Sequence, residues 1–173
     1  MRYYSGFGLQ MDRIFFKEIL DNSNYTIAGF SYGAQKAMQE AVSQVKNNQR
    51  VQKLQLISPA FFQHLKKEQI YKEIRAFTKN QDLYLKFFYK KICYPAKVEL
   101  QKFKKTPTLG ELKELLLYRW KEEELKLLQD SGVIIEVYLG EQDKIIDTEN
   151  VKNFFQNYAT IYSFKNAGHL LKE

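Results

Sequence analysis

Three residues far apart in the chain have types and surroundings that could perform nucleophilic chemistry, and the first of them is Ser31. It lies at the centre of Gly29–Gly33 (GFSYG), which has the spacing G-x-S-x-G. In this pattern a serine occupies a sharp turn between a strand and a helix, where its hydroxyl can attack a carbonyl carbon. Glycines suit the turn because a side chain at either position would press on neighbouring backbone. We therefore predict that Ser31 is a nucleophile.

The second residue is a base, because a serine hydroxyl attacks poorly unless its proton is removed. The sequence offers two histidines. His169 lies in a glycine-containing loop (NAGHL) directly after the last predicted strand, whereas His64 lies in a basic helical segment where a surface histidine is expected. We therefore assign His169 as the base.

The third residue is an acid, which must fix the tautomer of the imidazole and stabilise its protonated form. Asp143 follows the strongly apolar segment 133–139 directly, and we choose it as this acid. Glu141 and Asp147 are close alternatives. Asp147 is also suited to cap the next predicted helix, because it precedes Thr148.

Charge on a carbonyl oxygen under attack requires hydrogen-bond donors that are already in place. We expect one donor to be the backbone N–H of Tyr32, directly after the nucleophile. The other is expected from Gly6-Phe7-Gly8, where we choose the N–H of Phe7, although this segment could also be an ordinary flexible turn. Loss of one such donor typically raises the barrier by about 3 kcal/mol.

These residues need a scaffold, and the apolar patterns predict one alternating in strands and helices. The expected strands are residues 2–5, 25–30, 51–57, 133–139 and 160–164, and the expected helices between them include 9–20, 32–45 and 148–158. Strands separated by helices pair in parallel, so the fold class is α/β, with a sheet of about five mainly parallel strands covered by helices. Because sites in such sheets form at the carboxyl ends of strands, the three candidate residues are expected to meet there.

One long helical insertion interrupts this alternation, at about residues 60–128, with a break near Tyr94-Pro95. Its last helix is expected to begin at a capping box formed by Thr108 and Glu111, and to end before Gly132. Between Phe61 and Lys105 there are twelve basic and four acidic residues, whereas the rest of the chain is nearly balanced. This concentration predicts an acidic partner, the alternative being a solvated helical surface.

Composition limits the other possibilities. A chain of 173 residues with 45% apolar and 27% charged residues is expected to form one domain, residues 1–173. It has no apolar stretch long enough to cross a membrane and no secretory leader pattern, so we expect a cytoplasmic monomer that does not bind membranes. With one cysteine and two histidines, we expect no metal site and no cofactor. Cys93 lacks the strand–helix turn and neighbouring histidine of a nucleophile.

Four segments together resemble the α/β-hydrolase superfamily: SGFG at 5–8, GFSYG at 29–33, GEQDKIID at 140–147 and NAGHLL at 166–171. The order serine, acid, histidine is also that of this superfamily. More narrowly, the chain resembles the pimeloyl-[acyl-carrier protein] methyl ester esterases of biotin synthesis, especially the shortened BioV type. The usual hydrolase sheet has about eight strands, whereas about five are expected in this chain, so we expect a reduced form of the fold.

The resemblance implies a serine esterase that hydrolyses the distal methyl ester of a pimeloyl chain while the thioester to the carrier protein survives. The insertion would then form a lid, whose lysines and Arg75 receive the acidic carrier protein. Phe61 and Phe62, with Phe7 and Tyr32, would line the substrate channel.

Two other functions remain open. The same triad could serve a general short-chain esterase or an acyl thioesterase. Alternatively, the basic segment could bind nucleic acid, with lysines on phosphates and aromatic side chains stacked on bases: Tyr84, Phe87, Phe88 and Tyr89. We do not expect nucleic acid as a partner, because such aromatic residues more often face a core or a lipid channel.

Overall fold

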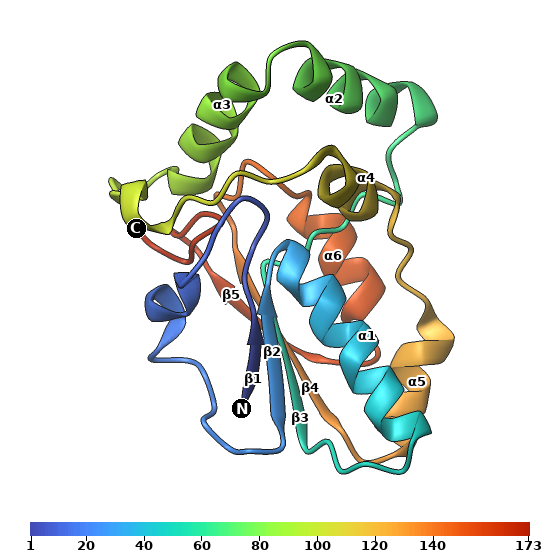
Figure 1. Cartoon of the computed structure of the whole chain (residues 1–173). Coiled ribbons are helices and arrows are strands. Elements are labelled where there is room, and N and C mark those ends of the chain that lie inside the picture. The colour runs from blue at the N-terminus through green and yellow to red at the C-terminus, as the bar shows by residue number, and fades with distance from the viewer.

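A computed structural model describes the whole chain, Met1–Glu173, and its centre is a five-stranded sheet (Figure 1). The strands are β1 (Arg2–Tyr4), β2 (Thr26–Phe30), β3 (Lys53–Ile57), β4 (Ile134–Gly140) and β5 (Thr160–Phe164). They lie in the order β1-β2-β3-β4-β5, and every neighbouring pair is parallel. The predicted α/β class and the five parallel strands are therefore confirmed.

Three helices cover one face of the sheet: α1 (Tyr32–Lys46), α5 (Glu122–Asp130) and α6 (Thr148–Phe155) (Figure 1). Side chains alternate along each strand, so every second residue points to this layer. Leu54, Leu56 and Val137 point toward the helices, and they form one buried cluster with Met38 of α1 and Phe155 of α6. This cluster is the main hydrophobic core.

The opposite face has no layer of helices, although Ile92, near the end of the helix α3 (Gln81–Cys93), joins its buried cluster. Its upper part packs against the short 3-10 helix η1 (Asp12–Phe16) and the irregular chain around Leu100. Lower down, polar side chains of the strands satisfy one another. Gln55 Nε2 donates to Glu136 Oε2 at 2.9 Å and to the Tyr138 hydroxyl at 3.0 Å. Buried polar groups cost free energy unless they are paired, and this network pairs the side chains of Gln55, Glu136 and Tyr138 with one another.

The insertion between β3 and β4 forms a cover over the carboxyl ends of the strands (Figure 1). It contains α2 (Lys67–Lys79), α3 (Gln81–Cys93), the 3-10 helix η2 (Gln101–Phe103) and α4 (Leu109–Leu117). The capping box of Thr108 and Glu111 begins α4 as predicted. A third buried cluster joins the cover to the strand ends, with Phe77 and Leu112 packed near Phe7 and Tyr32.

The end of the insertion differs from the prediction. The helix expected to run from Thr108 to before Gly132 is two helices, α4 and α5, and α5 packs against α1 and β4 instead of joining the cover. The break follows from Trp120, whose buried side chain donates from Nε1 to the Ala60 carbonyl at 2.9 Å. The cover therefore ends with α4.

The helix predicted over residues 9–20 is wrong in extent, because only η1 forms there. Two interactions divert the backbone. The N–H of Gln10 donates to the Phe103 carbonyl at 2.8 Å, and Met11 adopts a left-handed φ of 53°. Asp12 then turns its carboxylate inward, so the apolar periodicity of the segment describes burial against the sheet and not a continuous helix.

Candidate active site

Ser31 lies at a tight turn between β2 and α1, with a φ of 54° and a ψ of −113°. A positive φ is unfavourable for a residue with a side chain, and such strain concentrates at functional sites. Backbone contacts hold it: the Ser31 N–H donates to the Ile57 carbonyl at 2.8 Å. A Cβ on Gly33 would lie 2.0 Å from the Tyr4 carbonyl oxygen, and one on Gly29 would lie 2.1 Å from the Gly33 carbonyl oxygen. Both glycines are sterically required.

His169 reaches Ser31 from the loop after β5. Its Nε2 lies 3.0 Å from Ser31 Oγ, and its ring is fully buried. The Ser58 hydroxyl donates to the His169 carbonyl at 2.8 Å and so anchors the loop. Nothing in the sequence distinguishes Ser58 from an ordinary strand-ending serine, and it was not among the predicted site residues.

Asp143 completes the line of side chains. Its Oδ2 lies 2.6 Å from His169 Nδ1, and both side chains are inaccessible to solvent. The other oxygen, Oδ1, accepts from the N–H groups of Ile145 at 2.7 Å and Ile146 at 3.1 Å. These backbone donors fix the plane of the carboxylate and stabilise its charge.

The two alternative acids are engaged elsewhere. Asp147 caps α6, where Oδ1 accepts from the N–H groups of Glu149 and Asn150 at 3.1 and 3.2 Å. These hydrogen bonds lower the pKa of the Asp147 carboxyl. Glu141 is exposed and pairs with Lys152 at 3.6 Å. The structure therefore brings only Asp143 of the three acids to His169.

The two expected oxyanion donors lie at neighbouring ends of β1 and β2. Tyr32 is the first residue of α1, so its N–H has no acceptor one turn earlier in the helix. The N–H of Phe7 donates to no protein acceptor, whereas the flanking residues are held: Gly6 N–H donates to Asp12, and Leu9 N–H donates to the Gly6 carbonyl at 3.1 Å. The turn at Phe7 is thus ordered, not freely flexible.

A cleft of about 630 Å³ separates α2 and α3 from the loops that follow β3 and β4. Its apolar lining includes Phe62, Leu65, Phe88, Leu116 and Ile145, and three lysines also line it: Lys79, Lys91 and Lys144. Phe88 separates the cleft from the site, because its ring packs against Phe7 with centroids 5.4 Å apart. Ser31 itself is only 2% exposed, so the cover is closed over the nucleophile.

The remaining predicted residues occupy different positions. Phe62 lines the cleft. Phe61 does not line it, because its ring packs in the main hydrophobic core against Phe154 and Phe155. Phe7 and Tyr32 do not line the cleft either, so the assignment of Phe7, Tyr32 and Phe61 to a substrate channel stays a prediction. Arg75 is exposed on α2 and forms no ion pair, and it does not line the cleft.

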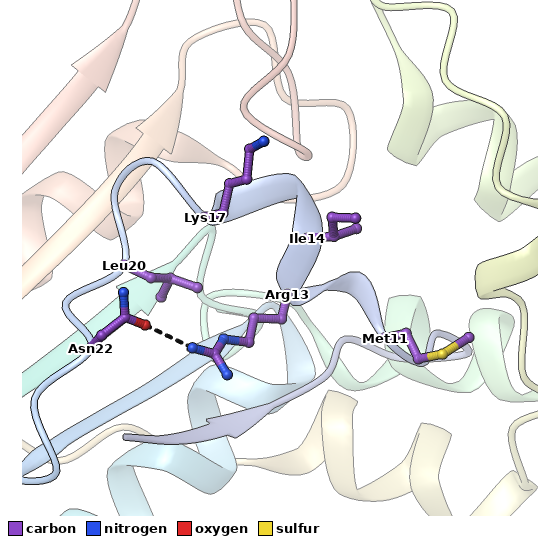
Figure 2. Close-up of a pocket in the computed structure, with 6 residues that line it drawn as sticks. All are labelled: Met11, Arg13, Ile14, Lys17, Leu20 and Asn22. Atoms are coloured by element: carbon purple, nitrogen blue, oxygen red, sulfur yellow. Dashed lines mark hydrogen bonds between the residues drawn. The ribbon is translucent and has the colours of Figure 1, made fainter.

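A second hollow, of about 520 Å³, lies beside η1 (Figure 2). It is lined by Met11, Arg13, Ile14, Lys17, Leu20 and Asn22, none of which was predicted to act in chemistry. Figure 2 shows Arg13 turned toward Asn22, to which it donates at 2.7 Å. The hollow contains no member of the triad.

The aromatic residues of α3 mostly face inward. Phe88 packs on Phe7, Tyr84 packs on Phe77 with ring centroids 5.4 Å apart, and the Tyr89 hydroxyl donates to the Gly8 carbonyl at 2.7 Å. Of the four aromatic residues considered for base stacking, only Phe87 is largely exposed.

The other reactive groups are not part of the hydrogen-bonded line of Ser31, His169 and Asp143. The Cys93 thiol is half-buried, and burial raises its pKa, which disfavours the thiolate.

No cluster of three or more histidine, cysteine, aspartate or glutamate residues could hold a metal ion. None of the helices has the length and apolar character needed to cross a membrane.

The parallel sheet, the strained serine turn and the loops after β4 and β5 together define a reduced α/β-hydrolase fold. The esterase EaEST from Exiguobacterium antarcticum matches this fold with a TM-score of 0.65 and 18% identity, over 92% of this chain and 64% of that one. BioG from Haemophilus influenzae matches with a TM-score of 0.59 and 12% identity, over 97% and 87% of the two chains. Naproxen esterase from Bacillus subtilis matches with a TM-score of 0.57 and 19% identity, over 84% and 53%.

These likenesses concern the fold, since all three identities are low. This chain spans just over half of the naproxen esterase and under two thirds of EaEST. No protein-family profile and no curated protein sequence matches the chain.

Proposed function

We propose that this protein is a serine esterase in which Ser31 is the nucleophile, His169 the general base and Asp143 the orienting acid. The observation that carries the proposal is the hydrogen-bonded line of the three side chains, with contacts of 3.0 Å and 2.6 Å. Nucleophile, base and orienting acid within hydrogen-bond reach are the geometric signature of such catalysis.

The reaction proceeds in two steps. Ser31 Oγ attacks the ester carbonyl carbon while His169 Nε2 takes its proton, and the N–H groups of Phe7 and Tyr32 stabilise the oxyanion. The bond between the carbonyl carbon and the alkoxy oxygen then breaks, and His169 gives its proton to the alkoxy oxygen. The alcohol departs, and the acyl group remains bound to Ser31. In the second step His169 removes a proton from water as the water oxygen attacks the acyl carbon. The bond between the acyl carbon and Ser31 Oγ then breaks, His169 returns the proton to Ser31 Oγ, and the acid is released.

For the substrate we propose the methyl ester of a pimeloyl chain carried by acyl carrier protein, as the sequence resemblance implies. Two features support this choice. The cleft has a largely apolar lining, which suits a hydrocarbon chain, and it borders the site at Phe88, which packs on Phe7. In addition, α2 and α3 carry seven basic and three acidic residues. None of these basic residues forms an ion pair within the chain, so their charge is free to attract an acidic carrier.

The test is hydrolysis of pimeloyl-carrier methyl ester, measured as the release of methanol and of the free carboxylate. Wild type and Ser43→Ala, a control serine exposed on α1, are expected to turn over, and Ser31→Ala is expected to lose activity. Equal turnover by Ser31→Ala would refute the mechanism. If free methyl pimelate or p-nitrophenyl butyrate is hydrolysed as efficiently as the carrier-linked ester, the protein is a general esterase and the carrier proposal fails.

A further inference from the structure

Asp12 is a buried acid that the proposed chemistry does not use. Its side chain is inaccessible to solvent, and it forms no ion pair with any cationic group. The other fully or largely buried acids are paired, Asp143 with His169 and Glu136 with Lys53 at 3.1 Å. Burying an unpaired carboxylate is costly, which raises the pKa of Asp12, so its retention here requires a local reason.

The polar contact that Asp12 makes lies directly under the oxyanion turn. Asp12 Oδ2 accepts from the N–H of Gly6 at 2.8 Å, and Gly6 immediately precedes Phe7. The fit is close: a Cβ on Gly6 would lie 2.7 Å from the Phe30 ring and 3.4 Å from Asp12 Oδ2. The carboxylate and the ring therefore support the turn from the sheet side.

The second oxygen of the carboxyl group is not engaged in the same way. Asp12 Oδ1 and the Tyr3 hydroxyl are both buried without a hydrogen-bond partner. Burial and the nearby Asp12 both raise the pKa of Tyr3, so Tyr3 keeps its proton and offers a donor beside Oδ1. Asp12 Oδ2 therefore has the Gly6 N–H as a hydrogen-bond donor, and the neutral Tyr3 hydroxyl lies near the same carboxyl group.

We infer that Asp12 is a positioning residue for the oxyanion hole, holding the Gly6–Phe7 peptide so that the Phe7 N–H stays directed at the reacting carbonyl oxygen. This inference rests on the proposed esterase function. An oxyanion donor stabilises a transition state only if it is in place before charge develops. Without this hydrogen bond the Gly6–Phe7 peptide could rotate, and the Phe7 N–H would stabilise the transition state less. This change would lower kcat more than it would raise KM.

The experiment compares Asp12→Asn, whose amide oxygen still accepts from Gly6, with Asp12→Leu, which removes the acceptor and keeps the branched shape of the side chain. With p-nitrophenyl butyrate we expect Asp12→Leu to lower kcat about 10- to 100-fold, part of the loss known for removal of an oxyanion donor. KM should change less than about 2-fold, because ground-state binding does not use the oxyanion hole. Asp12→Asn is expected to restore most of the activity.

Glu136→Leu is the matched control, because it removes a buried carboxylate that does not contact the turn. We expect it to lower thermal stability without lowering kcat of the folded protein. Equal kcat losses in folded Asp12→Leu and Asp12→Asn would overturn the inference, as would a loss that appears only in KM.

A second measurement does not depend on activity or on Asp12→Leu folding. Amide hydrogen exchange followed by NMR should show the Gly6 N–H protected in wild type and in Asp12→Asn, and more so than the Phe7 N–H. Fast exchange at Gly6 in wild type would overturn the anchoring. If wild type hydrolysed no ester while Gly6 remained protected, the esterase proposal would fail and the anchor would stand as a structural feature alone.

Discussion

The tautomer of His169 follows from its two contacts. Asp143 Oδ2 lies 2.6 Å from Nδ1, and an ionised carboxylate can only accept, so the proton of the neutral imidazole lies on Nδ1. Nε2 is then unprotonated and can accept from the Ser31 hydroxyl at 3.0 Å. Because Asp143 is itself held by the N–H groups of Ile145 and Ile146, the tautomer depends on a single, well-fixed side chain.

Asp143→Asn tests this dependence. An asparagine amide can donate to Nδ1, which would place the imidazole proton on Nε2 and leave no acceptor for Ser31. We expect kcat for p-nitrophenyl butyrate to fall about 10⁴-fold, as in other triads with this change. Asp147→Asn is the control, because asparagine caps helices as well as aspartate does. Comparable losses in the two variants would show that Asp143 has no special role.

At the scale of elements, the turn between β2 and α1 was accessible from the sequence because its constraints are local. An apolar strand, two glycines and helical spacing lie within a short segment, and each constrains the same turn. The other strands were also predicted, to within about two residues, because alternation or apolar runs mark burial directly. Long-range contacts were not accessible: the backbone of residues 9–12 is directed by Phe103, and Trp120 interrupts a helix to reach Ala60.

The same reasoning explains which site residues were found. Ser31 directly follows β2, and Asp143 and His169 lie in the loops after β4 and β5, so the parallel sheet brings all three to one edge. Asp12 does not follow a predicted strand. It lies among apolar residues at helical spacing, where a single acid is expected on the polar face of a helix. The sequence also does not reveal which of the neighbours Phe61 and Phe62 packs in the core and which lines the cleft.

The contact between α1 and the end of β1 gives a prediction about stability. Gly33→Ala would place a Cβ 2.0 Å from the Tyr4 carbonyl oxygen, in backbone that cannot yield without moving the sheet edge. We expect the free energy of unfolding to fall by about 3 kcal/mol or more. Gly110→Ala in α4 is the control, because the new Cβ would meet only Thr108 Oγ1 at 3.6 Å and alanine favours a helix. Denaturant unfolding of both variants checks this, and a Gly33→Ala protein as stable as wild type would contradict it.

At the scale of the whole molecule, the cover has two parts with different attachments. α4 is tied to the serine turn, because the Tyr32 hydroxyl donates to Glu114 and Gln35 Nε2 donates to the Leu115 carbonyl at 3.0 Å. α2 contacts α3 and α4, and both α2 and α3 also reach the turn after β1, where Phe77 and Phe88 pack on Phe7. The unpaired positive charge of the cover is therefore concentrated on α2 and α3, the two helices that border the cleft.

This arrangement predicts how salt affects the carrier-linked substrate. Attraction between exposed charges weakens as ionic strength rises, because the Debye length is only about 10 Å at 0.1 M salt. Arg75→Glu on α2 should lower kcat/KM for pimeloyl-carrier methyl ester about 5- to 10-fold at low salt, and the difference from wild type should shrink at 0.5 M salt. Lys126→Glu on α5 makes the same charge change far from the cleft and should have little effect. Hydrolysis of p-nitrophenyl butyrate should not change in either variant, because this ester carries no net charge for α2 to attract. Equal effects of Arg75→Glu and Lys126→Glu would mean that net charge alone matters, and that α2 does not receive the carrier.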